Sequence, residues 1–206
     1  MTKLEELQKL EEKMEADDSL PLKKGATRLV FGVGKADSEI LFIGEGPGYW
    51  EDQKGEPFVG NAGKLLDNVL RTIELPRESV YITNIVHHRP PENRDPEPAE
   101  ISAYGKYLDE LIKIIDPKVI ITLGRFSMGK FLPGATISSV HGKVQRVKWK
   151  DNDVVVVPMY HPAAALRNGN MMFSFKDDFK KVPEILKQAK EEEKIKKEKV
   201  EQMNLI

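Results

Sequence analysis

The stretch ILFIGEGPGYWED, residues 40–52, joins a short apolar run to a glycine-rich turn and then two acidic residues. A near-continuous apolar run is typical of a strand that is buried on both faces, as in a parallel sheet. Ligands of such sheets bind beyond the carboxyl ends of the strands, where this turn lies. The stretch therefore predicts a central strand of an α/β fold with a functional loop directly after it.

Four apolar runs of this kind alternate with helical patterns along the chain. The predicted strands cover residues 39–44, 80–86, 118–124 and 154–159. Helical spacing of apolar residues predicts helices over 62–73, 98–115, 126–132 and 175–190, the last with a charged continuation to about Met203. The alternation predicts a three-layer α/β/α sandwich around a short, mostly parallel sheet of four strands.

Composition limits the classes of site. The chain has no cysteine, which excludes disulfides, thiolate zinc sites, cysteine nucleophiles and cysteine-ligated iron–sulfur clusters. Its formal net charge of −1 gives no global indication of nucleic-acid binding, so such a site must be a local basic patch.

The 206 residues predict one domain over 1–190, with an N-terminal helix over 1–18, and a charged tail over 191–206. No apolar run is long enough to span a bilayer, and the acidic N-terminal segment is not a secretion signal. We therefore expect a monomeric, cytoplasmic protein with no membrane contact.

The turn GEGPG does not fit a phosphate-binding loop. The dinucleotide pattern would need glycine at position 49, where the chain has Tyr49, and Pro47 removes one backbone N–H. The glycines instead let main chain approach a planar ligand, while Glu45 and Glu51 place acids beside it. Two carboxylates in a cleft are suited to water activation or to stabilising a cationic transition state.

The ends of the four predicted strands collect polar side chains. They hold Glu45, Glu51, Asn84, His87, His88 and His161. This set can perform acid–base and hydrogen-bonding chemistry without a metal–thiolate centre.

Five ordered blocks carry a family resemblance. The segments GEGPGYWEDQKGEPFVGNAGKLLDNVL (44–70), VYITNIV (80–86), RPPENRDPEP (89–98), PKVIITLG (117–124) and MYHPAAALR (159–167) closely resemble the family-4 type uracil-DNA glycosylases. The resemblance implies the three-layer fold and hydrolytic removal of uracil from DNA.

The resemblance also implies site roles. Glu45 and Glu51 would handle water, Gly46 and Pro47 would lie against the base, Phe58 would stack on it, Asn84 would read it, and His161 would lie beside uracil O2. Two alternatives stay open: Glu51 either positions water or excludes a methyl group at C5, and Phe58 either stacks on the base or belongs to the core.

Chemistry supports these roles independently of the resemblance. An asparagine amide can donate to uracil O4 and accept from N3–H, whereas cytosine presents the opposite pattern. Bond cleavage leaves positive charge on the sugar and negative charge on the base, which a carboxylate and a histidine donor oppose. No metal is required.

The chain departs from the family where other members hold a four-iron, four-sulfur cluster with four cysteines. Those positions carry Asp17, Leu20, His88 and Tyr104. We expect no cluster and no other cofactor. Packing of Leu20 and Tyr104 and a hydrogen bond of His88 would take over the structural task.

A second departure concerns the residue that wedges into the duplex, which aligns with Ala165. Either Leu166 or Arg167 fills this role, or single-stranded uracil is preferred because base extrusion lacks a wedge. The candidate DNA contacts are Arg125, His141, Lys143, Leu166 and Arg167, with His141 standing where the family often has arginine.

The last five residues, QMNLI, run from Gln202 to Ile206 and resemble the peptide with which repair proteins bind the sliding clamp. A frayed or self-docked tail is the alternative. Two other functions also stay open: a non-catalytic or covalent uracil-DNA binding protein, and a glycosylase for another deaminated base such as hypoxanthine.

Overall fold

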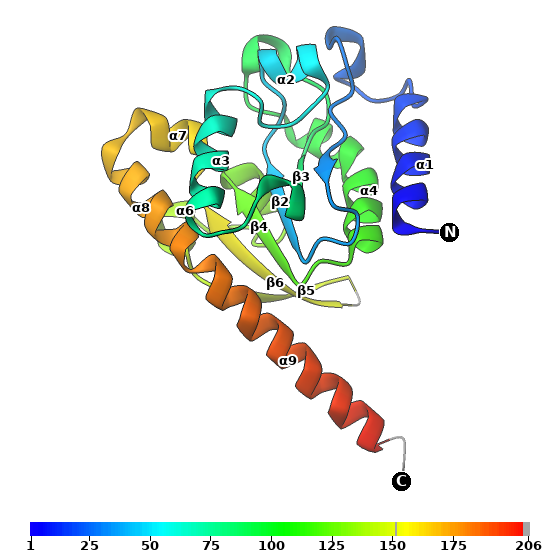
Figure 1. Cartoon of the computed structure of the whole chain (residues 1–206). Coiled ribbons are helices and arrows are strands. Elements are labelled where there is room, and N and C mark those ends of the chain that lie inside the picture. Colours follow the sequence, from blue (N-terminus) through cyan, green and yellow to red (C-terminus); the bar gives the residue numbers. More distant parts are fainter. Residues whose placement is uncertain (151, 204–206) are drawn as a thin grey trace.

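The computed structural model describes residues 1–150 and 152–203, and a mixed sheet forms its centre (Figure 1). Within this part of the chain the sheet has six strands in the order β1-β3-β2-β4-β6-β5. Their bounds are β1 Val33–Gly34, β2 Ile40–Gly44, β3 Tyr81–Asn84, β4 Val119–Leu123, β5 Gln145–Trp149 and β6 Asn152–Met159. The β3, β2, β4 and β6 strands run parallel and correspond to the four predicted strands.

The predicted strand count of four is wrong because two antiparallel edge strands, β1 and β5, flank the parallel centre. The β1 strand has only two residues, too few for a sequence pattern. In β5, sequence QRVKW, residues alternate between half-buried and exposed. Such an edge strand lacks the continuous apolar run of a strand buried on both faces.

Helices cover both faces of the sheet, which confirms the α/β/α sandwich. The longer ones are α1 Lys3–Glu15, α3 Asn61–Thr72, α4 Pro98–Ile115, α8 Gly169–Lys180 and α9 Val182–Met203; the shorter ones are α2 Tyr49–Lys54, α5 Arg125–Gly129, α6 Ile137–Val140 and α7 Pro162–Arg167. In the described part of the chain, single 3₁₀ turns lie at Lys23–Gly25, Arg77–Ser79 and Pro91–Asn93.

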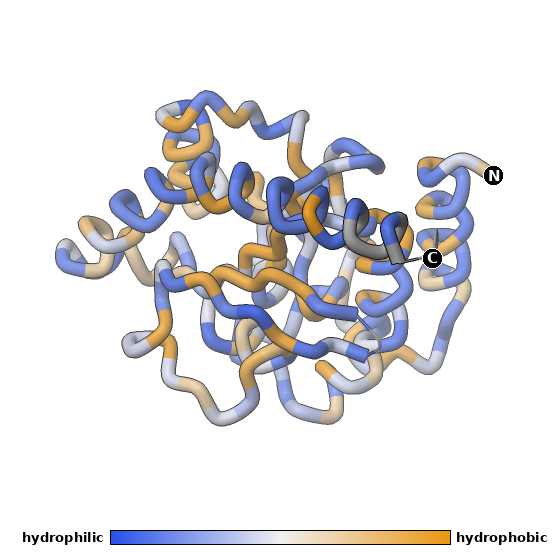
Figure 2. The backbone as a smooth tube through the Cα atoms, turned by 90° about the horizontal axis from the view of Figure 1, so that it is seen from below, coloured by the Kyte–Doolittle hydropathy of each residue, from blue (hydrophilic) through white to orange (hydrophobic). Residues whose placement is uncertain are grey.

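Alternate residues of β2 point to opposite cores. Leu41 and Ile43 join an apolar cluster with the inner faces of α1 and α4. Ile40 and Phe42 join a second cluster with α3, α8 and the first turns of α9. Figure 2 shows the hydrophobic segments gathered at the strands and the hydrophilic ones along the outer helices. This period-two alternation fixes which helices face each side of the sheet.

The C-terminal helical region is divided differently from the prediction. A single helix over 175–190 was expected, but α8 ends at Lys180 and α9 begins at Val182. Pro183 lies in the first turn of α9, where its missing N–H is tolerated, although it would break a helix interior.

The α9 helix continues to Met203 and extends away from the sandwich (Figure 1). Its middle is tied to the sheet by ion pairs of Glu192 with Arg146 and of Lys196 with Asp153. The division into a domain over 1–190 and a tail over 191–206 stays a prediction. Among the described residues, no helix combines the length and apolar character needed to cross a lipid bilayer.

Two adjacent histidines are buried beside the end of β3. His87 is fully buried, with its Nε2 3.2 Å from Thr83 Oγ1, and His88 is 2% exposed. Burial lowers the pKa of His87 to about 3 and that of His88 to about 4. Both rings are therefore neutral in the folded protein at neutral pH, whereas the unfolded chain protonates them below pH ~6.5.

We predict that the free energy of unfolding falls as pH decreases from 7 to 5. In this window the unfolded state binds more protons than the folded state, so each histidine removes roughly 2 kcal/mol of stability. Urea unfolding at several pH values measures the effect. In His87→Gln the proton uptake on unfolding should drop by about one; an unchanged pH slope would contradict the assignment.

Candidate active site

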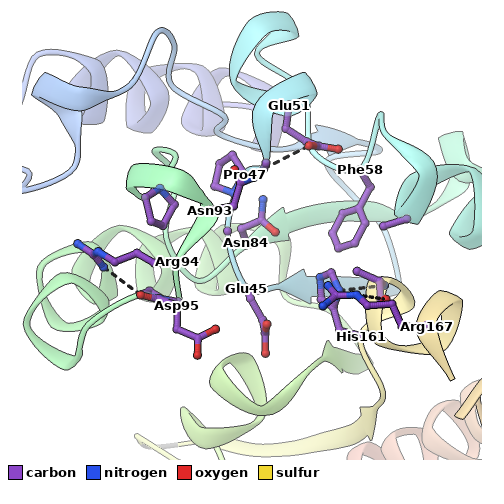
Figure 3. A pocket seen from close by; sticks show the side chains of 16 residues that line it. Glu45, Pro47, Glu51, Phe58, Asn84, Asn93, Arg94, Asp95, His161 and Arg167 are labelled. Carbon is purple, nitrogen blue, oxygen red and sulfur yellow. Dashed lines mark hydrogen bonds between the residues drawn. The ribbon is translucent and has the colours of Figure 1, made fainter.

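A cleft of about 290 Å³ opens at the carboxyl ends of β2, β3 and β6 (Figure 3). It brings together most of the site residues predicted from the sequence: Glu45, Gly46, Pro47, Glu51, Phe58, Asn84, His161 and Arg167. Figure 3 shows Asn84 near the middle of this pocket, with Phe58 and His161 to one side and Glu45 below. Segments that are far apart in sequence converge because parallel strands all end at the same edge of the sheet.

Asn84 is the last residue of β3 and is 2% exposed. Its Oδ1 atom has no hydrogen-bond partner among the described residues. Buried polar atoms in folded proteins are normally paired, and an unpaired one costs about 1–3 kcal/mol. A buried acceptor in a pocket is therefore suited to a ligand that donates a hydrogen bond.

Gly44, the last residue of β2, pairs with Asn84 in the sheet register. A Cβ atom at position 44 would lie 2.4 Å from Asn84 Oδ1 and 2.6 Å from the ring of Phe58. Any side chain here would displace both groups. The glycine thus permits the amide and the ring to meet over the strand end.

Phe58 adopts a left-handed backbone conformation with φ of 54°, which is strained for a bulky residue. Arg77 holds it by donating to the carbonyl oxygens of Pro57 and Phe58 while pairing with Asp67 at 2.9 Å. The Phe58 ring lies 5.7 Å from the His161 ring, centroid to centroid, with 30° between the planes. Phe58 lines the pocket and also belongs to an apolar core cluster, and its stacking on a base stays a prediction.

Glu45 follows β2 and packs against the start of α5. Its Oε1 accepts a hydrogen bond from the backbone N–H of Phe126 at 3.2 Å. Burial raises the pKa of the Glu45 carboxyl group, and that hydrogen bond opposes the rise. Gly124 makes the contact possible, because at its φ of 107° a Cβ atom would lie 2.3 Å from Glu45 Oε1.

His161 precedes α7, and its ring is oriented by that helix. Its Nδ1 accepts the backbone N–H of Ala163 at 3.2 Å, so Nδ1 is the unprotonated nitrogen. Burial, together with the positive charge of Arg167, lowers the pKa of His161 to about 4. The ring is therefore neutral at neutral pH, with its proton on Nε2, and can donate one hydrogen bond from that atom.

The carboxylate of Glu51 is occupied by backbone groups. One oxygen accepts from Val59 N–H and Gly60 N–H at 2.9 Å each, and the other accepts from Gly48 N–H at 3.2 Å. Glu51 thereby fixes the glycine turn to the segment that carries Phe58. It lines the pocket, but both of its oxygens have structural partners.

The predicted DNA contacts are scattered. Arg167 lines the pocket, and Leu166 is 48% exposed. The other three predicted contacts, none of which lines this pocket, have intramolecular partners: Arg125 pairs with Asp95, His141 with Asp178 at 2.6 Å, and Lys143 with the carbonyl oxygen of Ser139. Ala165, which the resemblance places at the wedge position, is 1% exposed and packs in the core. It cannot enter a duplex.

Sequence reasoning missed one wall of the pocket. Asn93, Arg94 and Asp95 line it from the loop that precedes α4. This segment belongs to the block RPPENRDPEP, residues 89–98, which carries the family resemblance but for which the sequence predicts no role in the site. Its position directly after a strand end was the available signal, since such loops border the binding site of parallel sheets.

The four positions at which the resemblance predicts cluster cysteines have other partners in this chain. His88 Nδ1 lies 2.8 Å from the Tyr104 hydroxyl oxygen, and Leu20 and Tyr104 are buried in the same core cluster. Asp17 accepts a hydrogen bond from Tyr107 at 2.7 Å. Leu20 has no ligating atom, and the chain has no thiolate, so these residues do not fit an iron–sulfur cluster. Among the described residues, no group of three histidines, aspartates or glutamates could hold a metal ion.

The fold and the pocket together define a class of protein: an α/β sandwich in which a buried amide, a carboxylate and a neutral imidazole surround a space beside an aromatic ring. A model of the uracil DNA glycosylase superfamily matches residues 31–187, and the chain belongs to that superfamily.

Three relatives are named type-4 uracil-DNA glycosylase. The Sulfurisphaera tokodaii protein is 44% identical over 190 residues, which cover 88% of this chain and 86% of that protein. The Archaeoglobus fulgidus protein is 47% identical over 169 residues, covering 80% and 85%. The Thermotoga maritima protein is 40% identical over 167 residues, covering 81% and 86%.

We predict that Tyr104→Phe lowers the free energy of unfolding by about 1–3 kcal/mol, because it leaves His88 Nδ1 buried without its partner. Urea unfolding at pH 7 measures the change. Tyr107→Phe is the matched control: Asp17 keeps hydrogen bonds from Lys106 and Ser19, so the loss should be smaller. An equal loss in both variants would contradict a specific role for the bond between His88 and Tyr104.

Proposed function

We propose that this chain is a monofunctional uracil-DNA glycosylase, which extrudes uracil from DNA and hydrolyses its N-glycosidic bond in base excision repair. The observation that carries the proposal is the buried Oδ1 of Asn84, which has no hydrogen-bond partner among the described residues and lies in a pocket shared with Phe58 and His161. The names of the relatives, type-4 uracil-DNA glycosylase, support the same activity.

Recognition of uracil rests on Asn84. Its Oδ1 accepts N3–H of the base, and its amino group donates to O4. Cytosine has an acceptor at N3 and a donor at C4, so both contacts become repulsive, and mismatched buried polar groups reject an analogue strongly. Phe58 stacks on the extruded ring, and the main chain of Gly46 and Pro47 covers the other side.

Cleavage breaks the bond between uracil N1 and sugar C1′, and the electron pair leaves with the base. His161 donates from Nε2 to the O2 atom on which negative charge develops, and it does so as a neutral donor. Glu45 stabilises the cationic sugar and takes the proton of the water that attacks C1′. Glu51 contributes by holding the Gly48 turn and the Phe58 segment in place around the reacting water.

DNA binding uses scattered basic side chains, of which Arg167 lines the pocket. Arg125, His141, Lys143 and Arg167 contact phosphates, and Leu166 takes the apolar contact nearest to the missing wedge. Because Ala165 is buried, base extrusion from a duplex lacks its usual support, which favours single-stranded uracil over paired uracil.

We propose that the enzyme works as a monomer in the cytoplasm without a cofactor. It would also bind the sliding clamp through Gln202 to Ile206, of which residues 204–206 lie outside the described part of the chain. The helix α9 supports this arrangement because its C-terminal end extends away from the sandwich (Figure 1).

The decisive test is release of free uracil from an oligonucleotide that contains one deoxyuridine. We expect Asn84→Ala to lower kcat/KM by about 10²- to 10³-fold, as for loss of one preorganised hydrogen-bonding group in an active site. Asn84→Asp should release uracil slowly and admit cytosine weakly, because the side chain then has no amide donor. Asn68→Ala, on the exposed face of α3, is the matched control.

Two results would overturn the proposal. The first is an intact deoxyuridine in every DNA context, and the second is wild-type uracil release by Asn84→Ala. A complex that survives SDS without free uracil would instead indicate a covalent uracil-binding protein, and selective release of hypoxanthine would indicate another deaminated base as substrate.

We predict that protein purified without oxygen from iron-supplemented cells contains far less than one iron atom per chain and has no visible absorption. The positions of Asp17, Leu20, His88 and Tyr104 offer no thiolate for a cluster. A family member that carries the four cysteines, prepared in parallel, controls for iron supply. Stoichiometric iron in a brown, active preparation would disprove the cofactor-free proposal.

A further inference from the structure

Two adjacent aromatic side chains are exposed at the rim of the pocket. Tyr49 is 50% exposed and Trp50 is 59% exposed, and they are the first two residues of α2. Their chain neighbours Gly48 and Glu51 both line the pocket. The two rings contact each other edge to face, with 5.2 Å between centroids and 80° between the planes.

A cation lies against this aromatic pair. The guanidinium carbon of Arg89 is 5.3 Å from the centroid of the Tyr49 ring. Arg89 also donates from Nε to Asn93 Oδ1 at 2.7 Å, and Asn93 lines the pocket. Arg89 therefore connects the aromatic pair on α2 to Asn93 in the wall of the pocket. The four remaining N–H donors of its guanidinium group are not used in these contacts.

Neither folding nor a protein interface explains the pair. Side chains that are half exposed or more bury little apolar area, so they add little to the core. The other exposed large apolar residues come from α7, α8, α9 and the N-terminal segment. A patch of two side chains is far smaller than a specific protein interface, which needs about 20–30 residues on each side.

We propose that Tyr49 and Trp50 form a stacking platform for the unpaired nucleobase next to the extruded uracil, with Arg89 contacting the phosphate between the two nucleotides. The proposal rests on the glycosylase function above. Bases of any identity stack on aromatic side chains, and the positive charge of arginine attracts the negatively charged phosphates of the DNA backbone. The ligand is single-stranded DNA, in which a base beside uracil is free to leave its neighbour.

The buried Ala165 gives the platform a specific task. Extruding a base removes stacking from both flanking bases, and the side chain at the wedge position cannot replace it. The aromatic pair at the rim replaces one of these lost stacking contacts, because a flanking base can stack on it. Stacking thus compensates for the lost wedge and orients the strand so that uracil enters the pocket.

The test uses single-stranded oligonucleotides with one deoxyuridine in which the base on the 5′ side or the 3′ side is replaced by an abasic analogue. Removal of the stacked base should lower wild-type kcat/KM about 5- to 150-fold on one of the two sides, the range that one base–aromatic stack supports. The variant Tyr49→Ala with Trp50→Ala should be slower on the intact oligonucleotide by a similar factor and insensitive to the abasic analogue.

Two controls separate stacking from general damage. Trp50→Phe keeps a ring and should retain sensitivity to the missing base. Phe173→Ala removes another exposed aromatic ring, on α8, and should behave like the wild type.

A second readout is independent of activity. The chain has two tryptophans, so Trp50 is the only one in Trp149→Phe. Its fluorescence should be quenched by a uracil-free single-stranded oligonucleotide and much less by the corresponding duplex.

The platform is wrong if the double variant keeps the wild-type rate and the wild-type sensitivity to the abasic analogue. It is also wrong if the wild type tolerates the abasic analogue on both the 5′ and the 3′ side. Retained activity together with binding of a protein at Trp50 would point to a protein partner. If the wild type releases no uracil from any oligonucleotide, the glycosylase proposal itself fails, and fluorescence quenching then decides whether the platform still binds single strands.

Discussion

The close approach of β2 and β3 at Gly44 and Asn84 is the constraint on which the site depends. These residues are paired in the parallel register, and the missing side chain at position 44 creates the space for the Asn84 amide and the Phe58 ring. The same principle holds on the other side, where Gly124 gives room to the Glu45 carboxylate. Backbone positions without a Cβ thus set the geometry of the functional side chains.

The pocket holds its polar groups in an unsatisfied or desolvated state before any ligand enters. Asn84 Oδ1 has no partner among the described residues, burial raises the pKa of Glu45, and burial lowers the pKa of His161 to about 4. Phe58 adds backbone strain at φ of 54°. Each feature lowers stability by itself, and such features persist only where the surrounding packing determines the conformation. Here Arg77 and the two core clusters supply that packing.

The sequence predicted the centre of the fold well because the relevant segments follow simple periodicities. The four parallel strands and the helix Pro98–Ile115 were recognised from continuous apolar runs and from helical spacing. The two edge strands were not predicted, because the residues of β5 alternate between half-buried and exposed and β1 is too short to show a pattern. The break between α8 and α9 was also missed, because apolar spacing continues across Lys181 and only Pro183 marks the new helix.

The site could likewise be predicted only in part from the sequence. Residues at strand ends, such as Glu45, Asn84 and His161, could be inferred because topology places them at one edge. Their detailed states could not, since the tautomer of His161 depends on the N–H of Ala163 and the position of Glu45 on the conformation of Gly124. The backbone contacts of Glu51 likewise arise from a turn geometry that spacing does not encode.

The contact between His88 and Tyr104 also affects the conditions under which this part of the protein can fold and stay folded. A tie that consists of a hydrogen bond between an imidazole and a phenol forms when the chain collapses, with no assembly machinery and no demand on metal supply. A chain without cysteine has no thiol for peroxide to oxidise. The contact that anchors His88 to α4 is therefore itself insensitive to oxygen, to chelators and to the redox state of the cell.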